Sequence, residues 1–223
     1  MPHNKKTKIV ATLGPATNTK EILAKMAEAG VNVFRINFSH ADYDIVKERV
    51  QQIREINEEN GYNVAILADL QGPKLRVGVM EDGVEVKAGD TFIFTTEKCT
   101  GTKEKAFMTY KRFPKDVKPG ENILVDDGKL LFEVVSTDKE KEVITKVING
   151  GPLKSKKGVN LPNTDISLPA LTEKDKKDVV FALEQEVDWI ALSFVRNPED
   201  LRMLRDLIKQ KSRYRVPVIA KIE

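Results

Sequence analysis

The pattern of apolar residues along the chain changes twice, and this constrains the fold more than any other feature. The first pattern consists of apolar strands rich in β-branched residues at 8–13, 31–38 and 64–69. Amphipathic helices are predicted between them at 20–29 and 43–59, because the apolar residues there recur at helical spacing. Strands that alternate with helices in this way predict a parallel sheet with right-handed crossovers.

The second pattern occupies residues 76–160, where short runs of alternating apolar and polar residues are separated by turn signals such as Asp127-Gly128. This spacing predicts an all-β insertion, a small barrel without helices. After Pro169 the first pattern returns, with further strands expected at 188–195 and 216–222 and a helix before each of them. The sequence therefore predicts five strands of a β/α unit, with an all-β segment inserted between the third and the fourth.

The fold class that fits this order is α/β: a partial (β/α)8 TIM barrel, made of its first five strands, with an inserted all-β barrel domain. An open doubly wound sheet is the alternative, and periodicity alone does not decide between the two. The expected domains are residues 1–73 and 161–223 for the β/α barrel and 74–160 for the insertion. The expected helix caps are Thr19, Thr172 with Asp175, and Asn197 before Pro198.

Composition argues against several classes of protein. Apolar residues make up 40% of the 223 residues, and no apolar run approaches the ~20 residues of a membrane span. The 37 basic and 34 acidic side chains are interleaved, which argues against a nucleic-acid partner. There is no N-terminal apolar signal region and Cys99 is the single cysteine, so a cytoplasmic setting is expected. We expect Cys99 to serve packing, and Lys154–Lys157 to be a solvated face or, alternatively, an anion-binding hinge.

Polar and charged side chains end three of the predicted strands, where (β/α)8 enzymes carry their chemistry. Charges that follow apolar strands are costly to desolvate unless they pair or bind something. Carboxylate, amide and hydroxyl oxygens suit hard cations such as Mg²⁺, while arginine and lysine suit a phosphate or carboxylate. Together they favour phosphoryl transfer or enolate chemistry. The residues are Arg35, Asn37, Ser39, Asp69, Lys221 and Glu223, with His40 as a further binding candidate.

Five segments of the sequence closely resemble pyruvate kinase in their order and spacing. The resemblance implies that the β insertion is that family's mobile lid domain and that the five strands begin its catalytic barrel. It also implies a glycolytic phosphotransferase that moves the phosphoryl group of phosphoenolpyruvate to ADP, giving ATP and pyruvate. The segments span residues 8–16, 32–40, 71–76, 156–162 and 220–223.

The same resemblance implies roles for individual residues. Arg35 would hold the phosphoryl group of phosphoenolpyruvate, and Lys221 would neutralise the transferring phosphoryl group and the enolate oxygen. Glu223 would ligate Mg²⁺ or Mn²⁺. The family's monovalent-cation site would correspond to Asn37, Ser39, Asp69 and the backbone carbonyl of Leu70. The nucleotide phosphates would contact Arg76 and Lys157, with Asn37 and His40 beside the nucleotide.

Lys74 departs from the family pattern, in which many members carry glutamate at this position and require K⁺. A lysine ammonium group is a compact monovalent cation on a flexible stem. We therefore expect Lys74 to supply this charge internally and the enzyme to be K⁺-independent. The alternative is that Lys74 only exposes its charge at the hinge of the lid.

The resemblance runs through the fifth strand of a barrel that needs eight, so we expect this sequence to belong to a longer chain and to be inactive alone. The intact protein is expected to be a homotetramer that binds phosphoenolpyruvate and ADP or ATP, with no nucleic-acid or membrane partner. Two alternatives stay open: a metal-dependent aldolase acting on pyruvate enolate, and a non-catalytic module that binds phosphate ligands.

Overall fold

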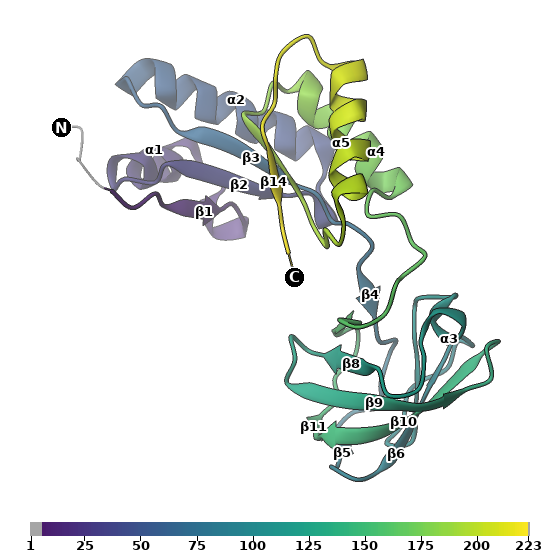
Figure 1. Cartoon of the computed structure of the whole chain (residues 1–223). Helices are drawn as coiled ribbons and strands as arrows, with labels where there is room; N and C mark the ends of the chain where they lie inside the picture. The colour runs from purple at the N-terminus through teal and green to yellow at the C-terminus, as the bar shows by residue number, and fades with distance from the viewer. Residues whose placement is uncertain (1–5, 223) are drawn as a thin grey trace. The chain divides into compact units, whose positions relative to one another are not determined.

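The computed structural model describes residues 6–222, apart from the side chain of His40. The chain forms two compact units, which can be followed by colour in Figure 1. One unit consists of Met1–Pro73 with Pro169–Glu223, and the other is Lys74–Leu168. Each unit has an apolar core of its own. The first unit is α/β, as the sequence predicts, and the second is built mainly of strands.

A five-stranded parallel sheet forms the centre of the α/β unit. Its order is β1-β2-β3-β13-β14, so each strand lies beside the next strand of this unit. A doubly wound sheet needs a reversal of strand order, and the described strands of this sheet contain none. The order therefore favours the barrel type of α/β fold. The strands are β1 (Val10–Thr12), β2 (Val33–Asn37), β3 (Ala65–Asp69), β13 (Trp189–Leu192) and β14 (Val218–Ala220).

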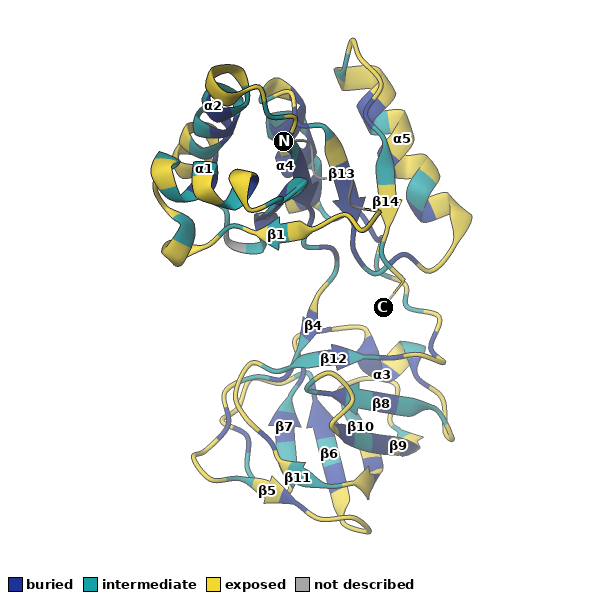
Figure 2. Cartoon of the chain, turned by 90° about the vertical axis from the view of Figure 1, so that its left-hand side faces the viewer, coloured by how far each residue is buried: buried dark blue, intermediate teal, exposed yellow. Residues whose placement is uncertain are grey.

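The core of this unit lies between the sheet and its helices, where Figure 2 shows the buried residues in dark blue. Phe34 and Ile36 of β2 point into this core, and Arg35 between them is left for the other face. The predicted caps at Thr19, Thr172 and Asn197 are confirmed, because each side chain accepts a hydrogen bond from its helix. The helices are α1 (Lys20–Glu28), α2 (Tyr43–Asn60), α4 (Glu173–Glu184) and α5 (Pro198–Lys211), with the 3-10 turns η1 (Pro15–Thr17) and η2 (Phe38–His40).

The β unit is a seven-stranded sheet in the order β4-β12-β8-β9-β10-β6-β7. An isolated bridge between Val77 and Met108, which follow β4 and β7, joins the two edges of this sheet. A separate two-stranded sheet pairs β11 with β5. The strands are β4 (Leu75–Arg76), β5 (Glu85–Val86), β6 (Thr91–Thr95), β7 (Lys105–Phe107), β8 (Asn122–Val125), β9 (Leu130–Thr137), β10 (Glu142–Asn149), β11 (Gly151–Pro152) and β12 (Gly158–Asn160).

Two expectations for this unit are wrong. The insertion contains a turn of helix, α3 (Phe113–Asp116), although none was predicted. Phe113 packs edge-on against Phe94 with ring centroids 6.0 Å apart, so tertiary packing fixes a turn too short to show helical periodicity. Cys99, expected to serve packing, is exposed, because it lies in the loop between β6 and β7.

The β unit extends to Leu168, beyond residue 160 where the sequence predicts its end. The carboxylate of Asp116 explains the difference. It accepts hydrogen bonds from the amide of Ser167 at 2.9 Å and from its hydroxyl at 2.7 Å. The hydroxyl of Thr164 donates in addition to Glu121, at 2.6 Å. These bonds attach the segment after β12 to the β unit.

Candidate active site

A buried carboxylate, that of Asp69, lies at the carboxyl end of β3 and is only 2% exposed. The guanidinium group of Arg35 donates to Asp69 Oδ2 through Nε at 2.6 Å and through Nη2 at 2.5 Å. The ammonium group of Lys221 donates to both carboxylate oxygens, at 3.0 and 3.1 Å. Two cations therefore share one carboxylate.

Ser193, which the sequence reasoning missed, completes this cluster. Its side chain is 3% exposed, donates to the carbonyl of Leu70 at 2.7 Å and accepts from Lys221 Nζ at 2.9 Å. The signal in the sequence was a polar residue directly after the apolar run 189–192, but the predicted strand extended through Val195 and concealed it. Ser193 therefore belongs with the polar residues at the strand ends.

Parallel pairing explains why these residues meet. Asn37 lies opposite Asp69, which in turn lies opposite Ala191. The amide of Lys221 donates to the carbonyl of Leu192 at 3.0 Å, which extends the pairing past β14. From β1, Thr12 accepts a hydrogen bond from Arg35 Nη1 at 2.8 Å. The carboxyl ends of parallel strands meet at one edge of a sheet, so all five strands contribute to this cluster.

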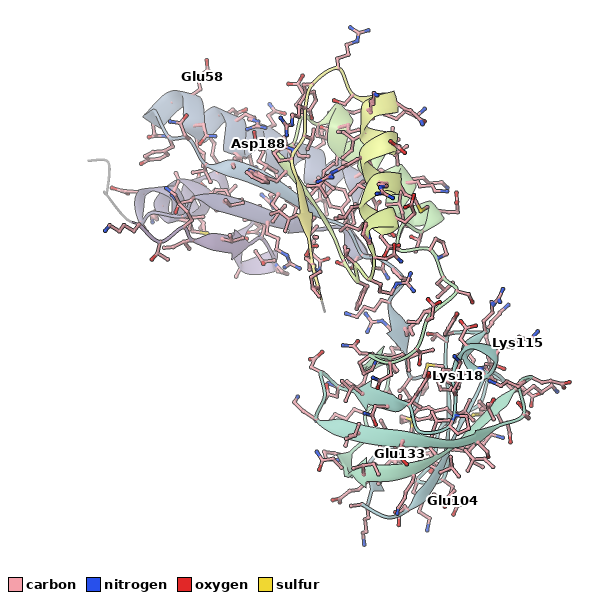
Figure 3. All side chains as sticks on the ribbon, in the orientation of Figure 1. Glu58, Glu104, Lys115, Lys118, Glu133 and Asp188 are labelled. Carbon is pink, nitrogen blue, oxygen red and sulfur yellow. The ribbon has the colours of Figure 1, made fainter. Side chains whose placement is uncertain are left out.

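The amino end of the same sheet has a different character. Asp188, labelled in Figure 3, precedes β13 and accepts from the backbone amide of Ile66 at 2.7 Å. Its other partner is Arg54, at 3.1 Å. Both side chains of this pair are more than a third exposed, Arg54 at 40% and Asp188 at 35%. An exposed pair that also holds a neighbouring strand has a structural role.

The residues that resemble the family's monovalent-cation site lie on two neighbouring segments. The side-chain oxygen of Asn37 accepts from the amide of Ser39 at 3.0 Å, within the turn that follows β2. Asp69 lies opposite Asn37, and the carbonyl of Leu70 follows it. The donor set is entirely oxygen, as a hard cation requires. Three of these oxygen groups already have partners, since Asn37 accepts from the Ser39 amide, Asp69 pairs with two cations and the Leu70 carbonyl accepts from Ser193.

The described residues do not form a binding site for a divalent metal ion. Within residues 6–222, no group of three or more His, Cys, Asp or Glu side chains is placed to hold a metal ion. Asp69 does not fit a divalent ion as it stands, because Arg35 and Lys221 occupy both carboxylate oxygens. Glu223, the metal ligand suggested by the sequence, lies outside the described residues, as does the side chain of His40.

Arg76 and Lys157 belong to the β unit, where strand pairing brings them together. Arg76 lies opposite Gly158, and its Nη1 donates to the carbonyl of Lys156 at 2.8 Å. Lys157 pairs with Asp126 at 2.8 Å, and this hydrogen bond lowers the pKa of Asp126 below its ordinary value. Arg76 on β4 thus lies beside the backbone of residues 156–158, and the ammonium group of Lys157, just before β12, is directed to Asp126. Lys154 is exposed, as expected for a solvated face.

Lys74 opens the β unit and is exposed. Among the residues that the structure describes, its ammonium group has no hydrogen-bond or ion-pair partner. A side-chain carbon added at Gly158 would come within 3.9 Å of Lys74 Cε, so the lysine stem passes close to the start of β12. Lys74 therefore forms no ion pair with any residue that the structure describes.

The residues predicted from the sequence thus fall into two groups. The strand-end residues Arg35, Asp69 and Lys221 form one cluster, with Asn37 on the strand beside it. Arg76 and Lys157 form a second pair in the β unit. No helix within the described part of the chain is long and apolar enough to cross a membrane.

Comparison with known proteins agrees with this arrangement. Residues 4–223 match the family model described as "Pyruvate kinase, barrel domain". A pyruvate kinase of Corynebacterium glutamicum is 46% identical over 221 residues, which cover 99% of this chain and 46% of that protein. For a pyruvate kinase of Bacillus licheniformis the identity is 44% over 221 residues, covering 98% and 38% respectively. Pyruvate kinase 2 of Synechocystis is 45% identical over 226 residues, covering 100% and 38%.

The chain therefore spans less than half the length of these curated relatives. The match nevertheless runs through both units, and it includes the strand ends that carry Arg35, Asp69 and Lys221. By the extent of the family match and by its identity to these relatives, this chain belongs to the pyruvate kinase family.

Proposed function

We propose that the protein containing this chain transfers the phosphoryl group of phosphoenolpyruvate to ADP, giving ATP and pyruvate. The observation that carries the proposal is the cluster in which Arg35 and Lys221 share the buried carboxylate of Asp69. The side chains of Arg35 and Lys221 are 30% and 31% exposed, whereas that of Asp69 is 2% exposed. A ligand can therefore reach the two cations from solvent, while the buried carboxylate of Asp69 holds both in position.

The proposed clamp works by preorganised charge. Arg35 is held by Asp69 and Thr12, and Lys221 by Asp69 and Ser193, before any ligand arrives. Donors fixed in advance stabilise the charge that develops on a transferring phosphoryl group and on the enolate oxygen it leaves. In this proposal Arg35 binds the phosphoryl group and Lys221 neutralises both it and the enolate.

The β unit supplies the proposed nucleotide contacts. Arg76 and Lys157, neighbours across β4 and β12, would bind the phosphates of ADP, with Asn37 and His40 beside the nucleotide. The required Mg²⁺ or Mn²⁺ would be held through Glu223 together with residues outside this sequence. We further propose that residues 74–160 are the core of the family's lid domain and that the parallel strands are the first five of eight.

Three other features belong to the same proposal. The intact enzyme is a cytoplasmic homotetramer, as expected for the family. The 223-residue chain assayed by itself turns over no substrate, because the clamp would lack the later strands of an eight-stranded barrel. No finding favours an aldolase or a non-catalytic phosphate-binding module over the kinase.

The proposal also includes independence of K⁺. Lys74 stands where many family members have glutamate, and its ammonium group has no partner among the described residues. A monovalent cation supplied by a lysine side chain can take the electrostatic place of K⁺. Exchange for glutamate would remove one positive charge and add one negative charge at this point.

The experiment that tests the function measures pyruvate formation from phosphoenolpyruvate, ADP and Mg²⁺, with and without K⁺. It uses the longest protein that the gene for this sequence encodes, referred to below as the longest product, and assays the 223-residue chain in parallel. Equal rates in both conditions support the kinase and the role of Lys74. A rate that appears only with K⁺ keeps the kinase and removes that role. No rate in either condition, from a folded longest product, removes the kinase.

The variant Lys74→Glu tests the cation idea by itself. We expect this variant to need K⁺ for full activity, since glutamate creates a site for a cation that lysine would otherwise replace. Lys154→Glu is the matched control, because Lys154 is an exposed lysine of the same unit. A response to K⁺ that is the same in Lys74→Glu as in the unaltered protein contradicts the idea.

A further inference from the structure

Helix α4 carries two buried carboxylates outside the cluster described above. Asp175 and Asp178 are each 0% exposed and lie three residues apart, on one face of the helix. Burying a carboxylate is unfavourable unless it is paired and hydrogen-bonded, and the apolar residues of α4 are sufficient to pack a helix. The partners of these two carboxylates therefore indicate what they do.

Asp178 is part of a chain of contacts that ends on the turn after β2. It accepts from Lys174 Nζ at 2.6 Å and from the hydroxyl of Tyr43 at 2.7 Å. The same ammonium group of Lys174 donates to the backbone carbonyl of Phe38 at 2.6 Å. Phe38 lies between Asn37 and Ser39, so Lys174 fixes the backbone of the segment that carries both.

The hydroxyl of Tyr43 remains a hydrogen-bond donor well into the alkaline range. Burial and the hydrogen bond to Asp178 raise the pKa of Tyr43 to about 12, so the hydroxyl stays a donor under ordinary conditions. The ring of Tyr43 stacks on Phe181 of α4, with centroids 4.1 Å apart and planes at 6°. The start of α2 is thereby attached to the same helix as Asp178.

Asp175 reaches the other segment of the site. One of its oxygens accepts from the amide of Gly72 at 3.1 Å, in the loop after β3. The other accepts from the amide and hydroxyl of Thr172, at 2.9 and 2.5 Å, and closes the cap of α4. Gly72 adopts a φ of +67°, and a side chain there would come within 3.0 Å of the carbonyl of Ser193. This loop is consequently held from two sides.

We propose that Lys174, Asp175 and Asp178 form a positioning frame that fixes residues 37–40 against residues 70–73. The inference rests on the proposed function, since these two segments carry the oxygens proposed to bind the cation and lie beside the nucleotide. The phosphoryl clamp is held by other side chains, those of Asp69, Thr12 and Ser193, and it meets the frame only where Ser193 donates to the carbonyl of Leu70, among the described residues. The frame therefore acts on nucleotide and cation binding and leaves the binding of phosphoenolpyruvate nearly unchanged.

The test compares Lys174→Met with Lys174→Arg and with Lys176→Met. Lys176 is the matched control, because it lies on the same helix, its side chain is 43% exposed, and its one ion-pair partner among the described residues is Glu173, at 2.7 Å. Amide hydrogen exchange of peptides covering 37–41 is measured on the 223-residue chain. The KM values for ADP and for phosphoenolpyruvate are measured on the longest product that carries the sequence.

We expect Lys174→Met to speed exchange in 37–41 and to raise the KM for ADP about tenfold, as loss of a positioning contact typically does. The KM for phosphoenolpyruvate should stay within about twofold, Lys174→Arg should restore both readouts, and Lys176→Met should change neither. If Lys174→Met does not fold, Tyr43→Phe removes one donor to Asp178 and should raise the KM for ADP about fivefold, and an unchanged KM would contradict the inference.

Two results overturn the inference. One is exchange in 37–41 that is as slow in Lys174→Met as in Lys176→Met. The other is a general role in stability, seen as faster exchange throughout the α/β unit with both KM values raised equally. If the protein proves not to be a kinase, the exchange measurement still decides whether Lys174 holds this segment, so the two failures are distinguishable.

Discussion

The two units of this chain differ in the polar groups that they bury. Every carboxylate buried among the described residues belongs to the α/β unit, whereas the buried polar side chains of the β unit are threonines. A buried threonine is satisfied by a single hydrogen bond, but a buried carboxylate needs cations or several donors. The carboxylates are Asp69, Asp175, Asp178 and Asp200, and the threonines are Thr95, Thr145 and Thr164.

The positions of these carboxylates show which parts of the α/β unit depend on buried charge. Asp200 caps α5, and Asp69 lies in the charge cluster. Asp175 and Asp178 lie on α4, where Asp175 contacts the loop after β3 and Asp178 holds Lys174, which contacts the turn after β2. The β unit instead relies on packing between phenylalanines, with Phe92, Phe94 and Phe132 at centroid distances of 5.1–5.3 Å. The two units should therefore respond to different kinds of substitution.

The largest effect is expected from Asp69→Ala. Removing this carboxylate takes away the buried counter-charge that Arg35 and Lys221 share, which should lower the free energy of unfolding of the α/β unit by about 3–5 kcal/mol. Urea unfolding followed by hydrogen exchange in each unit measures this. Glu133→Ala, at the exposed glutamate on β9 in Figure 3, is the control. A cost for Asp69→Ala no larger than that of the control would break the comparison.

Phe94→Ala is the corresponding change in the β unit. Phe94 is fully buried and contacts Phe92, Phe113 and Phe132. Its loss should cost the β unit at least about 3 kcal/mol, because a cavity remains where the ring was. The same exchange measurement should leave the α/β unit unchanged. If protection falls equally in both units, they do not unfold separately.

Thr145→Val sharpens the comparison from the polar side. Its hydroxyl donates to the carbonyl of Phe92 at 2.7 Å and has no charge to satisfy. We expect the β unit to lose only about 1 kcal/mol of unfolding free energy, the usual contribution of one hydrogen bond. Urea unfolding of Thr145→Val and of Asp69→Ala gives the two losses of unfolding free energy for comparison. Equal losses would show that a buried carboxylate contributes no more to stability here than a buried hydroxyl.

A smaller, pH-dependent effect is expected at Asp116. Burial opposes ionisation of this carboxyl group, but hydrogen bonds from Tyr110 and Ser167 outweigh it and lower the pKa of Asp116. A carboxyl group with a lowered native pKa stabilises the fold above its unfolded pKa and loses this contribution as the pH falls through the native value. Asp116→Asn should thus cost about 1 kcal/mol at neutral pH and progressively less in acid.

Urea unfolding at pH 7 and at pH 3 measures this dependence. Asp127→Asn is the control, since Asp127 is an exposed aspartate of the same unit and has no hydrogen-bond or ion-pair partner among the described residues. A cost for Asp116→Asn that is the same at both pH values would contradict the assignment of the shifted pKa to the hydrogen bonds of the folded state.

Local signals in the sequence predicted much of the α/β unit. The spacing of Thr172 and Asp175 predicts a capping box, and the structure confirms it. Asp175 also accepts a hydrogen bond from the amide of Gly72, and no local sequence pattern predicts this contact between distant segments. Arg35 and Asp69 could be named because a charge after an apolar strand stands out. Ser193 could not, because a serine beside an apolar run has no such contrast, and its role depends on contacts far along the chain.

The β unit was harder to read for a related reason. Its longer strands show alternation, but β4, β7, β11 and β12 have only two or three residues each, too few for a period to appear. The end of the unit at Leu168 depends on Ser167 meeting Asp116, a contact between distant segments. Sequence patterns capture what neighbours along the chain decide, and tertiary partners decide the rest.

The role of Arg35 and Lys221 as a phosphoryl clamp is tested most directly by one rate comparison. Pyruvate formation from phosphoenolpyruvate, ADP and Mg²⁺ is measured for Lys221→Met in the longest product that carries this sequence, beside Lys146→Met, an exposed lysine on β10. We expect kcat to fall about a hundredfold or more for Lys221→Met, because a preorganised charge is lost, and to stay unchanged for Lys146→Met. A folded Lys221→Met variant that keeps the original kcat would contradict the clamp.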